Sequence, residues 1–184
     1  VVGAASGSAR ADIELPSIWS VGLVQGLTPD LDLLAEATHT RWSVIDQIVV
    51  TDAASGGVRD ILALDFDNAW RFSVGANYRL SDALMLRAGV AYDQSPVKNA
   101  QTRTVRLPDA DRTWLALGLR FKVCERGVLD VGYAHLFVRD ADIDFTRGQL
   151  VPGTTNVNPA TATTLTGGYA TSVDVLSVQY NQRF

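Results

Sequence analysis

The 184-residue sequence predicts an all-β fold, a transmembrane antiparallel β-barrel of which about seven strands are present. Three observations predict this class. Apolar and polar residues alternate with period two over long segments, aromatic residues gather near the ends of the apolar faces, and short connections alternate with long ones. No segment approaches the about 20 uninterrupted apolar residues of a membrane-spanning helix, so a helical membrane protein is not expected.

The composition excludes several classes of protein. The chain is 47% hydrophobic and 20% charged, and its net charge is −4, with basic residues spread singly along the sequence. Because they form no positive stripe, binding to nucleic acid is not expected. The single cysteine, Cys124, cannot form a disulfide framework or a thiolate metal site within the chain. Residues 1–10 do not have the pattern of a secretory signal.

Period two is clearest over residues 68–80. One face carries Trp70, Phe72, Val74, Ala76 and Tyr78, and the other carries Arg71, Ser73, Gly75, Asn77 and Arg79. The same pattern predicts six more strands, at 16–26, 31 to about 50, 84–93, 114–123, 129–137 and 175–184. Only Gln182 interrupts the apolar face of the last one.

A soluble β-sandwich also alternates, and it is the alternative class. Three properties favour the membrane. The polar face consists mainly of Gly, Ala, Ser, Asn and Arg, which suits a wet lumen. Trp70 and Tyr92 lie near one end of the apolar faces, and Tyr78, Phe121 and Tyr180 near the other, as in interfacial girdles.

The connections supply the third property. They are short at 27–30, 81–83 and 124–127, and long at about 43–67, 94–112 and 140–168. Short periplasmic turns and long external loops are typical of outer-membrane barrels. Because bacterial single-chain barrels have even strand numbers, seven strands predict part of a barrel. We expect Val1 to lie in an external loop and Phe184 to be the native C-terminus at the periplasmic rim.

Two blocks of the 94–112 connection and its flanks carry a family resemblance. The first reads D-x-S-P-V and the second P-D-x-D-R-x-W; their residues are Asp93, Ser95, Pro96, Val97, Pro108, Asp109, Asp111, Arg112 and Trp114. At this separation they resemble the FadL family of outer-membrane transporters of long-chain fatty acids and hydrocarbons. Leu15-Pro16-Ser17-Ile18-Trp19, Trp42-Ser43, Asn68-Ala69-Trp70-Arg71 and the C-terminal Phe184 also resemble family patterns.

The resemblance implies a fourteen-stranded barrel plugged by an N-terminal hatch. Residues 1–184 would then be the C-terminal part of one barrel domain, without the hatch and the first strands. It further implies passive uptake of hydrophobic compounds with lateral release into the outer membrane of a Gram-negative bacterium. No cofactor is expected. The expected partners are a hydrophobic small molecule, outer-membrane lipid and lipopolysaccharide, and the barrel-assembly machinery acting on the C-terminal strand, with the protein a monomer.

The candidate ligand-binding residues lie above the predicted membrane region. Trp42, Ile45, Leu62, Leu64 and Phe66 form apolar runs where the family's ligand cavity is enclosed, and they suit an acyl or hydrocarbon ligand. A loop core without ligand is the alternative interpretation. The family's fatty-acid transporters have a lysine near the position of Leu62; its absence here favours an uncharged hydrocarbon.

The polar face supplies one more candidate. Arg71, the inward arginine nearest the outside, is a hypothetical receptor for a carboxylate head group. The alternative is a lumenal ion-pair network, for which the predicted register places Arg120 near Asp130 and Arg79 near Asp32. The residues of the two sequence blocks are expected to be structural, with Asp and Pro fixing turns and Arg112 binding a carboxylate at the loop base.

Catalytic and metal-binding residues are not predicted. His39 and His135 lie on the apolar face, and no serine and carboxylate set suggests that either is a general base. Two other functions remain open. One is a general diffusion porin with a wet, charged pore, and the other is a structural or adhesive outer-membrane protein.

Overall fold

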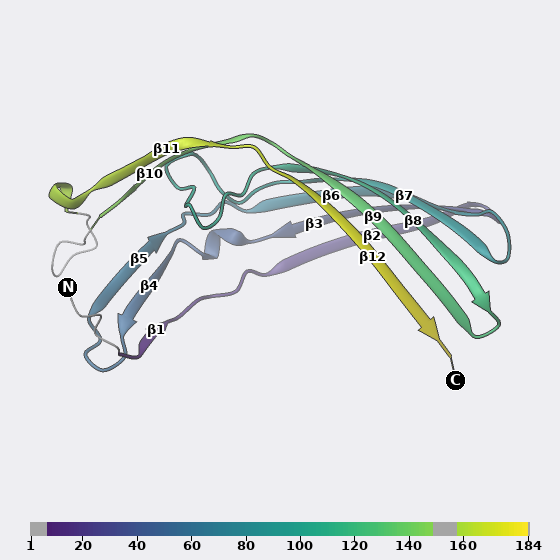
Figure 1. The fold of residues 1–184 in the computed structure, drawn as a ribbon, viewed down its shortest axis with the longest axis horizontal. Coiled ribbons are helices and arrows are strands. Elements are labelled where there is room, and N and C mark those ends of the chain that lie inside the picture. The colour runs from purple at the N-terminus through teal and green to yellow at the C-terminus, as the bar shows by residue number, and fades with distance from the viewer. Residues whose placement is uncertain (1–6, 149–157, 184) are drawn as a thin grey trace.

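The computed structural model describes residues 7–148 and 158–183, and their regular structure is almost entirely β-strand (Figure 1). The strands are β1 (Ala9–Ala11), β2 (Ile18–Thr28), β3 (Leu31–Thr40), β4 (Gln47–Asp52), β5 (Val58–Ala63), β6 (Ala69–Arg79), β7 (Leu84–Asp93), β8 (Arg112–Cys124), β9 (Gly127–Val138), β10 (Ala141–Arg147), β11 (Thr163–Tyr169) and β12 (Ser172–Gln182). Two short 3-10 helices, η1 (Trp42–Val44) and η2 (Pro159–Thr161), lie between them. No helix among the described residues has the length and apolar character to cross a membrane.

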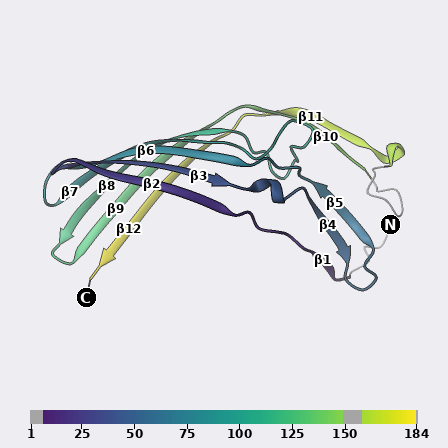
Figure 2. The same cartoon turned by 180° about the vertical axis from the view of Figure 1, so that it is seen from behind.

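Seven strands form one curved sheet in the order β12-β9-β8-β7-β6-β3-β2, and every neighbouring pair is antiparallel (Figures 1 and 2). Except for β3, each predicted long strand has its counterpart within a few residues at either end. The all-β fold class and the seven strands are therefore confirmed.

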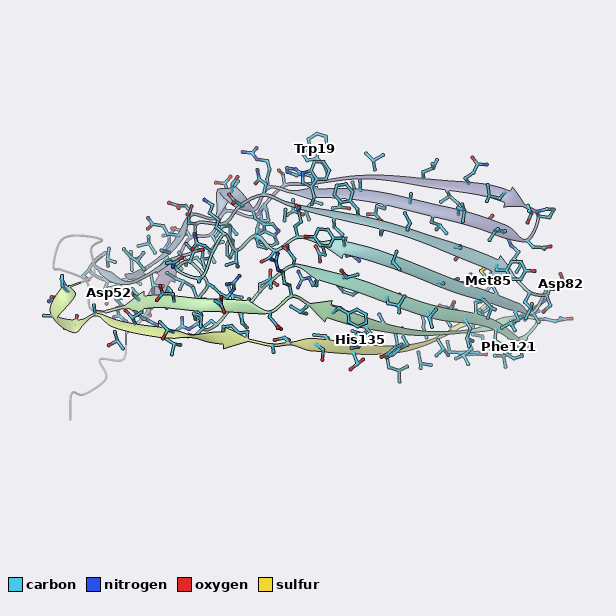
Figure 3. The ribbon with its side chains drawn as sticks, turned by 90° about the horizontal axis from the view of Figure 1, so that it is seen from above. Trp19, Asp52, Asp82, Met85, Phe121 and His135 are labelled. Carbon is cyan, nitrogen blue, oxygen red and sulfur yellow. The ribbon has the colours of Figure 1, made fainter. Side chains whose placement is uncertain are left out.

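The two faces of the sheet follow the predicted alternation. The apolar face is largely uncovered: Leu176 is 73% exposed and Val178 64% exposed. Trp19 projects away from the sheet on this side (Figure 3). Near the same end the rings of Trp70 and Phe72 stack at 5.6 Å. Exposed aliphatic and aromatic side chains on a full sheet face match a wall that contacts lipid.

The prediction of one strand from 31 to about 50 is wrong. β3 ends at Thr40, because Trp42 and Ile45 turn away to pack in the loops and the Ile45 N–H donates to the Trp42 carbonyl in a 3-10 turn, at 2.9 Å. The chain then continues as β4, which pairs with β1 and β5 in a separate three-stranded sheet.

The long connections contain their own hairpins. The β1-β4-β5 sheet and the β10-β11 hairpin extend from one end of the seven-stranded sheet, while the short turns lie at the opposite end (Figures 1 and 2). An ion pair of 2.7 Å between Arg147 and Asp60 connects the two outer hairpins. The unequal connections predicted from the sequence are thus present, with more strand in the long ones than predicted.

Candidate functional site

Arg112 holds the base of connection 94–111, which joins β7 to β8. Its Nε donates to Oδ2 of Asp93 at 3.0 Å, and its Nη1 donates to Oδ1 of Asp109, also at 3.0 Å. The hydroxyl of Ser95 donates to the second oxygen of Asp109 at 2.9 Å. Residues from both sequence blocks therefore meet in one polar network.

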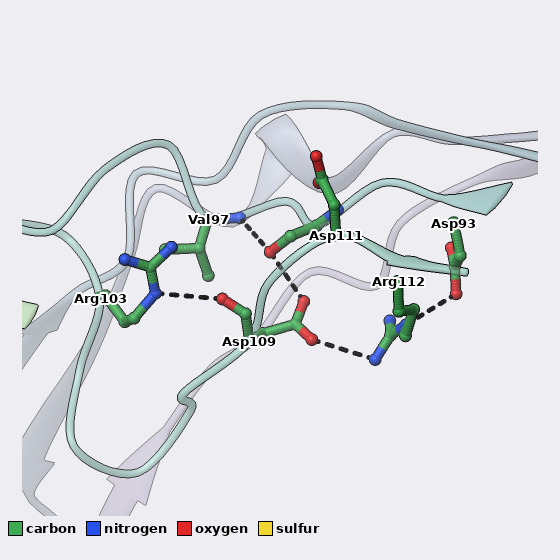
Figure 4. A network of polar contacts seen from close by, with 7 residues as sticks. Asp93, Val97, Arg103, Asp109, Asp111 and Arg112 are labelled. Atoms are coloured by element: carbon green, nitrogen blue, oxygen red, sulfur yellow. Dashed lines mark hydrogen bonds and ion pairs between the residues drawn. The ribbon is translucent and has the colours of Figure 1, made fainter. Parts of the chain in front are cut away.

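A second carboxylate, that of Asp111, closes the same connection. It accepts from the backbone N–H of Ser95 at 2.9 Å and from the hydroxyl of Tyr92 at 2.8 Å. The buried Arg103 donates through Nε to the backbone carbonyl of Asp109 at 3.1 Å (Figure 4). Bonds to charged groups are stronger than neutral ones, so this set fixes the loop conformation.

Connection 94–111 is also attached to three other parts of the chain by backbone hydrogen bonds. The N–H of Asp67 donates to Pro96, that of Arg139 to Asp111 and that of Asp144 to Ala100, at 2.8, 2.8 and 2.9 Å. Lys98 adds ion pairs to Asp65 at 2.6 Å and to Asp67 at 3.5 Å. The hydrogen bond that Lys98 donates to Asp65 raises the pKa of Lys98 above its usual range.

An apolar cluster lies next to this network. Leu64 is 2% exposed, and Phe66 and Val97 are each 8% exposed. Trp42, Ile45, Ile48 and Leu62 pack against these three. The rings of Trp42 and Phe66 meet edge to face at 6.1 Å. The cluster joins β4, β5 and connection 94–111 into one small core outside the barrel wall.

A cavity of about 580 Å³ opens between this cluster and the external end of the sheet; we call it the upper cavity. Its apolar lining is Ile18, Trp42, Phe66, Ala69, Trp70, Pro96, Val97, Leu107 and Pro108. Its polar lining is Thr38, Thr40, Arg71, Asp93, Gln94, Arg106, Asp109 and Arg112. Although polar residues make up nearly half of the lining, most of its exposed surface is apolar, as is typical of a small-molecule site.

The structure divides the residues predicted for ligand binding into two groups. Trp42, Phe66 and Arg71 line the upper cavity. Ile45, Leu62 and Leu64 pack in the cluster behind it and do not line the upper cavity.

Sequence reasoning missed five apolar lining residues, namely Ile18, Ala69, Trp70, Val97 and Leu107. These residues lie within or beside the sequence segments that resemble the family, and this proximity could have identified them. Five of the predicted structural residues also line this cavity: Asp93, Pro96, Pro108, Asp109 and Arg112. Phe184 lies outside the described residues.

A second hollow of about 830 Å³ lies against the polar face of the sheet; we call it the lumenal hollow. Small residues make room for it: Gly22, Gly75, Gly89, Ala116, Gly118, Gly132 and Ser177. At Gly75 a Cβ atom would come within 3.0 Å of the Ala88 carbonyl oxygen, so even a methyl group would crowd this wall.

Charged side chains on this face form the predicted ion pairs. Arg79 contacts Asp32 at 2.6 Å, and Arg120 contacts Asp130 at 2.8 Å. Asp130 also forms an ion pair with Arg87 at 3.2 Å, which was not predicted. Residues 120 and 130 are paired directly in the register of β8 and β9. The two predicted contacts, Arg79–Asp32 and Arg120–Asp130, are confirmed.

Arg71 differs from those arginines. Its guanidinium carbon lies 4.9 Å from the centre of the Trp114 ring, a cation–π contact. Among the described residues no carboxylate forms an ion pair with it. The indole nitrogen of Trp114 is buried and also has no hydrogen-bond partner within that part of the chain.

One polar group lies on the apolar face where none was predicted. Asp174, at the external end of β12, accepts hydrogen bonds from the hydroxyl of Tyr133 at 2.6 Å and from Nδ1 of His135 at 2.7 Å. Asp174 directly precedes the predicted strand at 175–184, where only Gln182 interrupts the apolar face. Two cross-strand partners satisfy the carboxylate, which allows it to remain beside the aromatic girdle.

The fold defines the wall of an outer-membrane β-barrel protein, and a cavity lies at the external end of this wall. A family model described as "Outer membrane protein transport protein (OMPP1/FadL/TodX)" matches residues 1–184, and the chain belongs to this family. The family resemblance carried by the two sequence blocks is thereby confirmed. Because the relatives are outer-membrane proteins of Gram-negative bacteria, that membrane is the location of this chain.

Individual relatives agree with the family. The long-chain fatty acid transport protein of Escherichia coli K12 is 30% identical over 142 residues, which are 77% of this chain and 31% of that protein. The chain thus spans about a third of that relative's length. A crystal structure of a Pseudomonas aeruginosa FadL homologue matches 96% of the chain and 37% of its own, with 30% identity and a TM-score of 0.80. The toluene transporter TodX of P. putida, at 17% identity and a TM-score of 0.62, shares the fold.

Proposed function

We propose that the complete protein takes up hydrophobic compounds passively across the outer membrane, and that the upper cavity receives them. The observation that carries this proposal is the cavity itself, about 580 Å³ in volume, at the external end of the barrel wall and lined mainly by apolar side chains. Removing apolar ligand surface from water supplies about 25 cal/mol per Å², so binding there needs no cofactor. The names of the E. coli and P. putida relatives support the same class of ligand.

In this proposal the ligand is captured by the external loops, enters the barrel and leaves sideways into the membrane after a hatch rearranges. Its own concentration gradient drives the movement. The hatch and the remaining strands would belong to the part of the protein outside residues 1–184. Lipid and lipopolysaccharide would contact the apolar outer face, the barrel-assembly machinery would act on the C-terminal strand, and the protein would work as a monomer.

The test is ligand binding to the complete protein. We expect saturable binding of a radiolabelled long-chain fatty acid or of toluene, lost on Phe66→Asp and on Leu107→Asp. Both residues line the cavity, and Leu107 is 43% exposed, so its replacement should spare folding. Val58→Asp is the matched control, because Val58 is 50% exposed and lines none of the described cavities. Retained binding in both cavity variants would contradict the assignment.

Liposome swelling separates this function from a general porin. Reconstituted protein should exclude sugars that a wet, open pore admits. Rapid sugar permeation would favour the porin, whereas absence of any hydrophobic ligand binding would favour a structural or adhesive protein.

A further inference from the structure

Two hollows follow one another along the inner side of the barrel wall. The upper cavity lies at the external end of the strands, and the lumenal hollow lies against the polar face below it. Among the described residues, Arg71 is the one whose side chain lines both. A ligand that moves from one hollow to the other therefore passes this guanidinium.

The contacts of Arg71 make it the most easily displaced arginine of this wall. Arg79, Arg87 and Arg120 each have a carboxylate partner, at 2.6, 3.2 and 2.8 Å. Arg71 rests instead on the face of Trp114, 4.9 Å from the ring centre. A cation–π contact is weaker than a bidentate pair between arginine and a carboxylate, so an incoming acid group can replace the ring.

Two carboxylates on the neighbouring strands do not take this place. Asp93 pairs directly with Arg71 in the register of β6 and β7, but its side chain is bound by Arg112 at 3.0 Å. Glu36 lies diagonally across from Arg71, since Arg71 pairs with Thr38 in the register of β3 and β6. One of its oxygens accepts from Ser20 at 2.7 Å and from Thr38 at 2.9 Å. Glu36 is thus held by its own strands, and the structure records no ion pair between it and Arg71 within the described residues.

We propose that Arg71 is a gate between the upper cavity and the lumenal hollow that opens for anionic amphiphiles. This inference rests on the proposed function. With no ligand, the side chain stacked on Trp114 separates the hollows. A carboxylate or similar acid head group in the upper cavity binds the guanidinium with two parallel hydrogen bonds and draws it off the ring, and the apolar tail follows. An uncharged hydrocarbon forms no such bond, so the gate discriminates acids from hydrocarbons during passage.

The experiment uses the complete protein in liposomes and measures uptake of a long-chain fatty acid and of toluene separately. Arg71→Met keeps a long side chain but removes the charge. We expect it to lower fatty-acid uptake by about tenfold or more, since the charge-assisted pair is lost, and to leave toluene uptake equal or faster. Arg71→Lys retains the charge without the bidentate geometry and should lie between the wild type and Arg71→Met.

Lys122→Met is the matched control. Lys122 is an exposed lumenal cation near the short turns that lines neither hollow, so its removal should change neither uptake rate. Equal changes for the two ligands in Arg71→Met, or no change for the fatty acid, would overturn the gate. Wild-type protein that takes up neither ligand would instead overturn the proposed function.

Tryptophan fluorescence gives an independent measurement. Fatty acid should change the emission of the wild type because Arg71 leaves the Trp114 ring, and toluene should cause a smaller change. Trp114→Phe should abolish the acid-dependent difference. A difference that persists unaltered in Trp114→Phe would contradict movement of Arg71 off this ring.

Discussion

Replacing Leu64 with alanine tests whether the apolar cluster holds the external loops independently of the barrel. Leu64 is 2% exposed and packs in a cluster with Phe66 and Val97, but it does not line the upper cavity. Truncation of a buried leucine costs about 3 kcal/mol, from lost transfer energy and the void that remains. Since 1.4 kcal/mol is about a factor of ten, the population of opened loops should rise on the order of 100-fold.

Hydrogen–deuterium exchange of the complete protein measures this change directly. Amides of β4 and β5 should exchange faster by that factor, whereas amides of β6, β7 and β8 should keep their wild-type rates, because the barrel wall has its own hydrogen-bonded ladder. Val58→Ala, on the same hairpin but 50% exposed, is the control and should have little effect. Unchanged exchange in β4 and β5, or equal acceleration of the barrel strands, would refute an independent loop core.

Two further predictions concern the polar contacts of the loops. Arg112→Met removes the cation that binds Asp93 and Asp109, whose side chains are 18% and 26% exposed, and should loosen connection 94–111 by about 2 kcal/mol after allowance for solvent. Faster limited proteolysis within 94–111 would show it, and wild-type cleavage rates would contradict it. The second prediction concerns Asp52, whose pKa is lowered by hydrogen bonds from the N–H of Ser55, the guanidinium of Arg59 and the N–H of Ala54. Its carboxylate therefore stabilises the β4–β5 turn fully at pH values above its unfolded pKa of about 3.9. This stabilisation is lost as the pH falls through the lower pKa of the folded state. Asp52→Asn should therefore speed amide exchange at 54–57 at pH 6 and have no effect once Asp52 is protonated. The same ratio of variant to wild-type exchange rates at pH 6 and at a pH where Asp52 is protonated would refute this.

The strands could be predicted because the alternation of apolar and polar residues is visible within each strand's own sequence. Alternation along 68–80 fixes both the strand and its two faces, and it requires no knowledge of the neighbours. The pair Arg120–Asp130 also followed from local sequence, because a short turn sets the register between β8 and β9. The additional contact from Arg87 to Asp130 did not, since the register of β7 against β8 depends on how an 18-residue connection folds.

The loops limited the prediction for the same reason. The sequence predicted Trp42, Ile45 and Phe66 to be apolar residues above the membrane. It did not indicate whether these side chains face a ligand or pack against one another. Continuing the strand to residue 50 was wrong because the burial of Trp42 in the loop core outweighed the extended propensity of residues 47–50. The bond from Ser95 to Asp109 joins residues 14 apart, which alternation cannot reveal.

The hydrogen bonds of connection 94–111 have a consequence for how the external surface of this protein can diverge or be engineered. Its backbone is joined to Asp67, Arg139 and Asp144, so a foreign peptide inserted there would displace three other segments at once. The β4–β5 turn at 53–57 is held mostly by Asp52 and its own hairpin. An epitope or affinity tag displayed on living cells should therefore be accepted at the β4–β5 turn and rejected between residues 94 and 111.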